Sequence, residues 1–400
     1  MTDNTKVGIE LEMLVTDQEG KLSNRADEIL ESSLNPGNIV KEGTYSLVEF
    51  VSDPCNSLED LEKDMRTGLK NIKTIADSLG LNTVPLSDIG PDGRNMRREG
   101  DGRYNVNSRI WGKERIKIHN TICGTHIHID KQDENIKQYN LVESLDPVFV
   151  MLSSSPFLQG QNTLNSCRVN AYRNKIFGEF PLHGQLTDYL EDASQRDRRD
   201  MIRYDQWIRV SGIGEEAKEY FSIDDTCWGP LRERQNTMEA RANDTNLPSN
   251  ILAAAAFYKG INDHVFRKCL DIRVSRDDCD YYADEEKIML PSYKTLKKLE
   301  SQGIRYGLKS DIVHDYLSYL TDMAYDGLGN EEKRYLSPFQ AMIKYRRNMA
   351  DMMKSHALSK GYTPGTRLDS QTACEINNMI YNLYSDDIEG KLDYESVLMN

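Results

Sequence analysis

Apolar and polar positions alternate at the start of the chain, from Val7 to Leu14, where apolar side chains are separated by glycine and glutamate. A period of two predicts a half-buried β-strand with its apolar face toward a core. Glu10 and Glu12 then share the other face, because successive side chains of a strand point to opposite sides. Two neighbouring carboxylates repel each other unless a cation lies between them, and Mg²⁺ takes oxygen ligands. A lone pair of this kind is more often a solvated strand face, so its meaning depends on the rest of the chain.

Three further segments have the pattern of a strand with one chemically dense face. Cys123–Asp130 and Thr237–Asn243 alternate apolar residues with the polar residues His126, His128, Asp130, Thr237, Glu239, Arg241 and Asn243. In Tyr45–Ser52, Glu49 has apolar neighbours on both sides. A carboxylate in such a position is costly to bury unless it is paired or bound to a metal.

Helical spacing dominates elsewhere. Ser57–Gly80 has an apolar stripe, a capping serine and a closing glycine. Ser249–Leu270 is helical with an alanine-rich first half, which suggests close packing, and the pattern is helical again from about Leu296. The remaining expectations are a polar turn over Lys21–Asn38, a strand over Arg115–Asp130, helices over Leu141–Leu152 (Pro147 in a first turn) and Gln185–Trp207, and a solvated acidic loop over Asp277–Glu286.

Together these elements predict an α+β fold, in which a curved antiparallel β-sheet has helices packed on its back. A weak boundary near Pro291 divides the chain into a catalytic region, residues 1–290, and a mostly helical C-terminal region, residues 291–400, which we expect to pack on the same domain.

Composition narrows the class of protein. The 400 residues are 38% hydrophobic and 28% charged, which suits a globular protein. A net charge of −14 argues against nonspecific nucleic-acid binding, and an anionic substrate would need a local basic pocket. The longest apolar run, Ile251–Tyr258, is too short to span a bilayer, and no signal peptide is evident. Seven scattered cysteines without a C-x-x-C suit reduced thiols, so we expect a cytoplasmic protein with no membrane partner.

One basic stretch stands out in this acidic chain. Asp88–Arg109 contains four glycines among the arginines Arg94, Arg97, Arg98, Arg103 and Arg109. It is a candidate flap over a phosphate or nucleotide, and a plain exposed loop is an equally good interpretation.

The dense strand faces combine into one constellation. The sheet would present Glu10, Glu12, Glu42, Glu49, His126 and Glu239 as metal ligands, with Arg232 and Arg241 as cations. Five carboxylates and one imidazole are too many for a tetrahedral zinc site and suit two or more Mg²⁺ or Mn²⁺ ions. Several such ions in one site usually serve phosphate chemistry. Neither a P-loop nor the kinase H-R-D and D-F-G elements occur.

Four motifs in order give a resemblance to a known family. They are G-I-E-L-E at Gly8–Glu12, C-G-T-H-I-H at Cys123–His128, S-P-F-L-Q-G at Ser155–Gly160 and T-M-E-A-R-A-N-D-T at Thr237–Thr245. The chain thereby resembles the glutamate–cysteine ligase type 2, or carboxylate–amine ligase, family over roughly Lys6–Tyr258. The wider superfamily is that of glutamine synthetase, which implies a glutamine synthetase-like catalytic fold.

The resemblance implies ATP-dependent ligation with Mg²⁺ or Mn²⁺. In the family the γ-carboxylate of glutamate attacks the γ-phosphate of ATP, and an amine, usually cysteine, then displaces phosphate from the acyl phosphate. The implied partners are therefore small molecules: glutamate, an amine such as cysteine, and ATP. The oligomeric state stays open, a homo-oligomer included.

The resemblance also implies roles for single residues. Glu10, His126 and Glu239 match the metal set on the ATP phosphates, and Glu12, Glu42 and Glu49 match the set nearer the substrate carboxylate and the transferring phosphoryl group. His128 matches a histidine close to the nucleotide phosphates. Arg232 and Arg241 match arginines that bind the substrate carboxylate or stabilise the phosphoryl group, and the catalytic residues so implied are Arg232, Arg241 and Glu49.

Some features depart from the family. Thr125 stands where members have a bulkier residue, and Trp228–Arg232 lacks the common aspartate beside its arginine. These departures leave the acceptor amine open. Alternatives are a ligase for another amino acid or amine, a guanidino-kinase-like phosphotransferase, and a noncatalytic metal-binding protein. Further pocket candidates are Trp111, Tyr172 and Arg173, with Arg346, Arg347 and Asn348 in the helical region, and we expect Glu239→Ala to abolish turnover without disturbing the fold.

Overall fold

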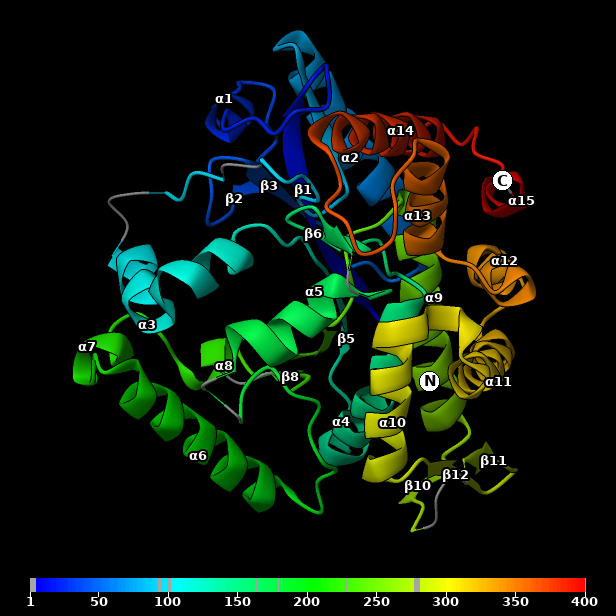
Figure 1. The fold of residues 1–400 in the computed structure, drawn as a ribbon. Coiled ribbons are helices and arrows are strands. Elements are labelled where there is room, and N and C mark those ends of the chain that lie inside the picture. The colour runs from blue at the N-terminus through cyan, green and yellow to red at the C-terminus, as the bar shows by residue number, and fades with distance from the viewer. Residues whose placement is uncertain are drawn as a thin grey trace.

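A curled antiparallel sheet forms the centre of the computed structural model (Figure 1), which describes residues 5–92, 95–98, 102–162, 164–178, 180, 182–226, 229–276 and 281–399. Its strand order is β2-β3-β1-β5-β9-β8, and β4 pairs with the C-terminal end of β1. The strands are β1 (Val7–Asp17), β2 (Ile39–Lys41), β3 (Leu47–Val51), β4 (Leu81–Val84), β5 (Thr125–Asp130), β8 (Leu231–Arg232) and β9 (Thr237–Ala240). The predicted α+β fold with an antiparallel sheet is confirmed.

The alternation of the sequence determines which face of each strand is buried. On β1, Val7, Ile9 and Leu11 are at most 1% exposed, whereas Glu10 and Glu12 are half-buried on the other side. β5 shows the same alternation from Thr125 to Asp130. Because β1 lies between β3 and β5, its glutamates are adjacent to residues of both neighbouring strands.

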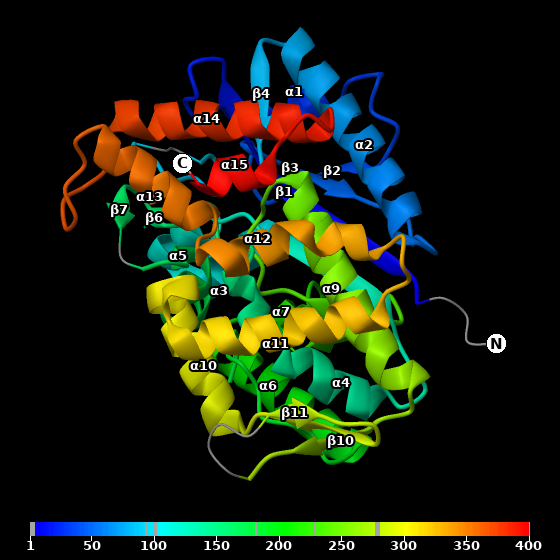
Figure 2. The ribbon, with the colours of Figure 1, turned by 90° about the vertical axis from the view of Figure 1, so that its right-hand side faces the viewer.

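Helices cover the apolar face of the sheet, as Figure 2 shows. The helices α2 (Leu58–Ser78), α9 (Pro248–Arg267) and α14 (Ser370–Ile388) contact strands of the sheet, and α11 (Asp311–Gly327) and α12 (Ser337–Tyr345) pack on α9. The predicted helix after Ser57 is confirmed, since the Ser57 side chain accepts a hydrogen bond from the backbone N–H of Asp60. The alanine-rich helix α9 contacts β1, β5 and α11. Gly260 allows the approach of α11, since a Cβ there would lie 2.4 Å from the carbonyl oxygen of Ala324.

The C-terminal helices belong to the same hydrophobic core as the sheet. Buried side chains from Val7 to Leu398 form one continuous cluster. The further helices are α1 (Ala26–Leu30), α4 (Asn135–Ser144), η1 (Asp146–Val150), α10 (Tyr293–Tyr306), η3 (Gly307–Lys309), η4 (Lys333–Leu336), α13 (Met349–Ser359) and α15 (Tyr394–Met399). Residues on both sides of position 291 thus share one hydrophobic core. The boundary near Pro291 stays a prediction.

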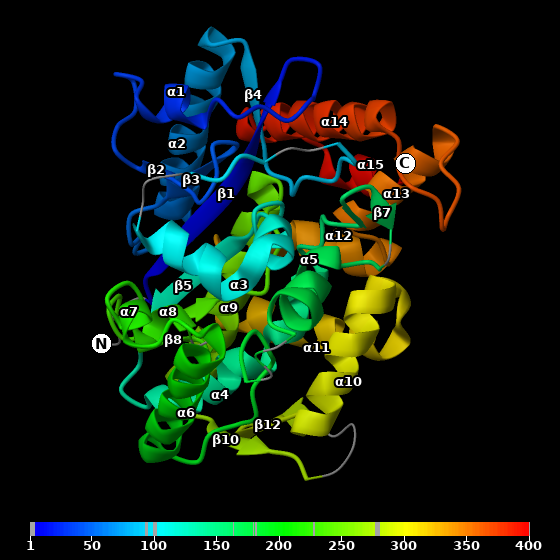
Figure 3. The same cartoon turned by 60° about the vertical axis from the view of Figure 1, so that its left-hand side comes forward.

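A second, smaller apolar cluster lies on the other side of the sheet. It is built from α3 (Gly102–His119), β6 (Phe157–Leu158), α5 (Cys167–Asn170), the π-helix η2 (Ala171–Ile176), α6 (Ala193–Ser211) and α7 (Glu215–Lys218), and the short helix α8 (Ile223–Thr226) contacts α6. Figure 3 shows α3 and α6 in front of the sheet from this side. Buried side chains of the cluster include Trp111, Trp207 and Phe221. The polar face of the sheet thus lies between two hydrophobic clusters.

Several element predictions were wrong in detail. Arg115–His119 belongs to helix α3 and not to a strand, because it packs with the second cluster, and only Thr125–Asp130 is extended. The basic stretch becomes helical from Gly102. Helix α4 begins at Asn135, before the predicted start, and Pro147 opens the separate 3₁₀ turn η1. Other missed or misplaced elements are α1 within the polar turn, the start of α6 at Ala193, and a small sheet of β10 (Asp271–Val274), β11 (Tyr282–Ala283) and β12 (Lys287–Leu290).

Of the predicted acidic loop Asp277–Glu286, β11 (Tyr282–Ala283) is a strand of the small sheet, whereas residues 277–280 lie outside the described residues. A separate two-stranded antiparallel sheet consists of β6 and β7 (Gln161–Asn162). Among the described helices none combines the length and the apolar character that crossing a membrane requires.

Candidate active site

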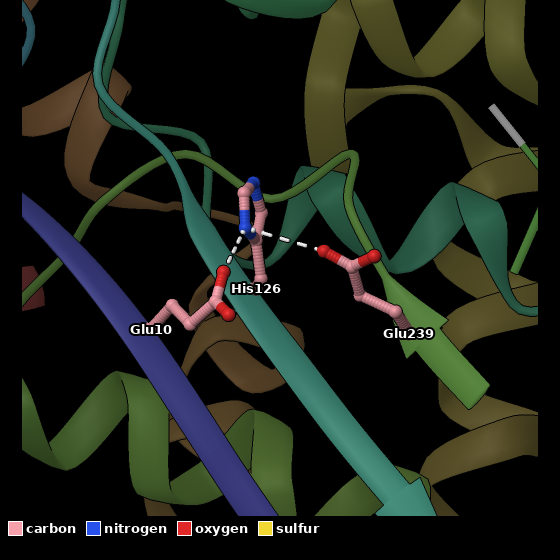
Figure 4. A group of neighbouring side chains, drawn as sticks. All are labelled: Glu10, His126 and Glu239. Carbon is pink, nitrogen blue, oxygen red and sulfur yellow. Dashed lines mark hydrogen bonds and ion pairs between the residues drawn. The ribbon is translucent and has the colours of Figure 1, made fainter. Parts of the chain in front are cut away.

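The first group of polar side chains consists of Glu10 on β1, His126 on β5 and Glu239 on β9. Adjacent strand pairing places them side by side, since Glu10 is directly opposite His126 in the β1–β5 ladder. In Figure 4 the three side chains point toward one another. His126 Nδ1 lies 2.7 Å from Glu10 Oε2 and 3.2 Å from Glu239 Oε1. One ligand atom from each residue lies within 4.8 Å of the others, as a shared metal ion requires.

Two arginines hold the Glu239 carboxylate. Glu239 is 4% exposed, and its Oε2 accepts hydrogen bonds from Arg232 Nε and, at 2.9 Å, from Arg241 Nη1. Burial alone would raise the pKa of Glu239, but the charges of Arg232 and Arg241 outweigh it and hold the pKa well below its usual range. Arg232 also donates to the carbonyl oxygen of Asp224 at 3.0 Å. The Glu239 carboxylate is therefore ionised and paired with two arginines.

The second group consists of Glu12, Glu42 and Glu49, whose ligand atoms also lie within 4.8 Å of one another. Glu12 is directly opposite Glu49 in the β1–β3 ladder, and Glu42 follows the last residue of β2. Burial and repulsion from Glu42 raise the pKa of Glu12 to about 7. Burial and repulsion from Glu42 and Glu12 raise the pKa of Glu49 to about 10. Glu49 therefore stays protonated at neutral pH, and its proton lowers the repulsion among the three carboxylates.

Two backbone N–H groups contact the second group directly. Gly124 donates to Glu12 Oε2 at 2.6 Å, and Gly43 donates to Glu42 Oε2 at 3.1 Å. These bonds favour the charged forms, but burial outweighs them in both glutamates, so the pKa values of Glu12 and Glu42 are raised. The two groups therefore differ: two arginines hold Glu239 of the first group ionised, whereas burial and mutual repulsion raise the pKa values of the carboxylates of the second.

His128 lies beside the first group. Its Nδ1 lies 2.9 Å from Thr237 Oγ1, and its Nε2 lies 3.5 Å from Glu10 Oε1 and 3.9 Å from Glu239 Oε1. His128 Nε2 is buried and has no hydrogen-bond partner. Together with His126 it lowers the pKa of Glu10 below its usual range, against the effect of burial. The nitrogen is thus directed at the carboxylates of the first group and is available to a ligand there.

The donor sets suit hard divalent ions. Each group offers carboxylate oxygens, with a single imidazole in the first, and oxygen-rich sets of this kind favour Mg²⁺ or Mn²⁺ over zinc. Three carboxylates crowded together and a buried His128 Nε2 without a hydrogen-bond partner are both features of a site that can hold a cation. The residues present therefore fit the expected ions.

The structure brings together all six residues expected as ligands, and both arginines expected as cations. The basic stretch behaves differently. Arg98 is buried and binds Asp27 and the carbonyl oxygen of Glu42, while Arg97 donates to Asn105. The other described arginines pair with acidic residues, Arg103 with Asp225 at 3.1 Å and Arg109 with Glu216 at 2.7 Å. The flap hypothesis also involved Gly93, Arg94 and Gly100, which lie outside the described residues.

The further pocket candidates have mainly structural surroundings. Arg173 is 3% exposed and forms ion pairs with Asp146 on η1 and Glu300 on α10, which join η2 to both elements. Trp111 packs against Phe177 with ring centroids 4.9 Å apart. In the helical region, Arg346 pairs with Asp311 at 2.5 Å, Arg347 donates to Leu398 O and Ser355 Oγ, and Asn348 caps α13.

Two residues beside the carboxylates were not singled out from the sequence. Gly124 supplies an N–H to Glu12, and the buried guanidinium of Arg168 lies directly behind Gly124. Gly124 belongs to the C-G-T-H-I-H motif, so its position shortly before the two histidines could have indicated that it lies at the site. Arg168 has no such signal, because it is distant in sequence from both strands.

The chain matches the family model described as glutamate–cysteine ligase family 2 over residues 6–363. Among curated relatives, a protein of Paraburkholderia xenovorans named as a candidate glutamate–cysteine ligase 2 is 28% identical over 287 residues, which is 68% of this chain and 71% of the relative. A similarly named protein of Legionella pneumophila is 28% identical over 329 residues, which is 77% of each chain.

Solved structures share the fold at low sequence identity. The glutamate–cysteine ligase of Francisella tularensis, in complex with AMP, aligns with a TM-score of 0.59 at 13% identity over 99% of this chain and 93% of its own. A bifunctional glutathione synthetase from Pasteurella multocida also aligns with a TM-score of 0.59 at 13% identity, over 96% of this chain and 53% of its own. These alignments confirm the expected fold class over nearly the whole chain.

Proposed function

The chain belongs to glutamate–cysteine ligase family 2 and is a carboxylate–amine ligase, and from this premise we propose that it joins the γ-carboxylate of glutamate to an amine, cysteine first among them, with ATP and Mg²⁺ or Mn²⁺. The observation that carries the proposal is the pair of neighbouring ligand groups on one sheet face, Glu10–His126–Glu239 and Glu12–Glu42–Glu49. Two adjacent divalent-ion sites are what phosphoryl transfer to a carboxylate needs.

The proposed reaction has two steps. The γ-carboxylate of glutamate attacks the γ-phosphorus of ATP, so that ADP leaves and an acyl phosphate forms. The amine nitrogen then attacks the acyl carbon, inorganic phosphate leaves, the nitrogen loses a proton and an amide results. When bound, the divalent ions would neutralise and orient the phosphate oxygens. The AMP bound to the Francisella ligase, which has the same fold, supports a nucleotide as one substrate.

The chain's own residues would position the substrates. Glu10, His126 and Glu239 would hold the ion on the ATP phosphates, with His128 Nε2 directed at the same place. Glu12, Glu42 and Glu49 would hold the ion nearer the carboxylate that receives the phosphoryl group. Arg241 is part-exposed beside Glu239, and its planar fork suits an anionic oxygen pair of a substrate.

A phosphate-release screen tests the proposal. The protein would be incubated with ATP, Mg²⁺ and glutamate, together with cysteine, other amino acids or simple amines. Inorganic phosphate should appear only when glutamate and an accepted amine are both present, and hydroxylamine should trap the acyl phosphate as a hydroxamate. No release with any glutamate pair would overturn the proposal. ADP formation with a phosphorylated product and no free phosphate would indicate a phosphotransferase instead.

A further inference from the structure

Arg168 is a fully buried arginine behind the second carboxylate group. It lies on the short helix α5 and is 1% exposed. Its Nη1 donates to the carbonyl oxygens of Ala242, at 3.2 Å, and Arg241, at 3.4 Å. Its guanidinium carbon lies 5.1 Å from the centre of the Tyr172 ring. The side chain thus joins α5 and η2 to the segment that follows β9.

The guanidinium packs directly against Gly124. A Cβ on Gly124 would lie 2.1 Å from Arg168 Nη2 and 2.7 Å from its Cζ, so any larger residue would displace the guanidinium. Gly124 in turn donates its N–H to Glu12 Oε2 at 2.6 Å. The positive charge therefore lies one peptide group behind Glu12.

A buried hydrogen-bond network determines where Arg168 lies. The backbone N–H of Arg168 donates to Ser155 Oγ at 3.0 Å, and Ser155 Oγ donates to Asp244 Oδ2 at 2.6 Å. Asp244 also accepts from the backbone N–H of Ser154 at 2.9 Å. Arg168 Nε and Asp244 Oδ1 are both buried without a hydrogen-bond partner. Such an arrangement is costly to maintain, and this cost is understandable if the guanidinium has to lie against Gly124.

We propose that Arg168 is a positioning residue for the second metal site: by packing behind Gly124 it orients the N–H that binds Glu12, and so holds the Glu12 carboxylate where it can bind a divalent ion together with Glu42 and Glu49. This inference rests on the proposed function and adds to it a residue for one of the two sites. The first site has the side chains of Arg232 and Arg241 in direct contact with Glu239, whereas Arg168 contacts only the backbone carbonyl oxygen of Arg241 there.

Mn²⁺ binding to the full chain tests the inference without any turnover. Free Mn²⁺ would be counted by electron paramagnetic resonance during titration of the wild type, which should bind two ions. Glu239→Gln should weaken the ion of the first site and Glu12→Gln the ion of the second, which identifies the two sites. Arg168→Met should weaken only the second ion, by about 10- to 100-fold, the usual effect of losing a residue that supports a ligand. Arg168→Lys, which retains the charge without the planar fork, should fall between Arg168→Met and the wild type.

Two further variants guard against a merely structural effect. Gly124→Ala keeps the charge but displaces the guanidinium, and it too should weaken the second ion alone. Arg168→Met in the Glu239→Gln background should leave neither site with its normal affinity. The inference is overturned if Arg168→Met binds both ions as the wild type does, or loses both equally. If the wild type itself binds no Mn²⁺, the metal part of the proposed function is wrong as well, which separates the two failures.

Discussion

Glu10 and Glu12 are two residues apart on the same face of β1, yet they contact different partners. Glu10 is opposite His126 on β5, and its pKa is lowered. Glu12 is opposite Glu49 on β3, and its pKa is raised to about 7. The strand β1 is therefore shared by two groups of opposite electrostatic character, and most of our predictions follow from this difference.

Glu49→Gln should abolish catalysis while leaving the metal-free protein folded. With a pKa of about 10, Glu49 is protonated at neutral pH, and glutamine resembles the protonated acid. We expect the free energy of unfolding to change by less than about 1 kcal/mol and kcat/KM to fall by about 100-fold or more. Urea unfolding and phosphate release measure the two effects. Glu28→Gln, an exposed glutamate on α1 paired with Arg25, is the matched control and should retain activity.

The metal-free protein should become less stable as pH rises from 5 to 9. Glu12 and Glu49 have folded-state pKa values above the ordinary 4.5, so between those values the folded chain holds more protons than the unfolded chain. Their stabilising contribution is complete below pH 4.5 and is lost as pH rises through about 7 for Glu12 and about 10 for Glu49. Urea unfolding across this range should show a steeper decline for the wild type than for the double variant Glu12→Gln/Glu49→Gln. Equal slopes would contradict the prediction.

Mg²⁺ should bind more tightly as pH rises, because ions displace the protons of the second group. At pH 7 binding should release roughly one to two protons. Calorimetric titration with Mg²⁺ in two buffers of different ionisation enthalpy measures this number. Glu49→Gln should bind with less proton release, and proton-free binding by the wild type would show that the second group is not a ligand set.

Glu239→Ala should destabilise the protein, contrary to the expectation drawn from the sequence. That expectation assumed a crowded acidic cluster, whereas Glu239 is buried and neutralises Arg232 and Arg241. Removing one member of a buried ion pair leaves an unpaired charge, which costs about 3 kcal/mol or more. Urea unfolding should show this loss in metal-free protein. Replacing both partners, Arg232→Met with Glu239→Leu, should cost less than Glu239→Ala alone, and a fully stable Glu239→Ala would contradict the assignment.

Gly260→Ala should loosen the contact between α9 and α11. The added Cβ would lie 2.4 Å from the carbonyl oxygen of Ala324, so a backbone must shift. We expect a loss of about 1 to 3 kcal/mol, the usual cost of overpacking a core. Gly329→Ala has room for its Cβ, with no atom nearer than 3.8 Å, and serves as the control. Thermal unfolding should separate the two variants.

The sequence alone determined the features that depend on local periodicity. Alternation along Val7–Leu14 and Cys123–Asp130 predicted which residues face the core, because a strand repeats every two residues. The serine cap of α2 and the close packing of α9 were also predicted, since both follow from residue types at fixed spacing. The ordered motifs indicated the family and contained Glu10, Glu12, His126 and Glu239, while Glu42 and Glu49 were expected from the resemblance, and the fold brings all six together.

Only the tertiary structure decided what depends on contacts between distant segments. Arg115–His119 is helical because it packs in the second apolar cluster, which its own sequence does not show. The neutralisation of Glu239 by Arg232 and Arg241, and the place of Arg168 behind Gly124, follow from strand pairing and from the packing of α5. Local patterns state which face a side chain takes, whereas the partner across that face is determined by how the chain folds back on itself.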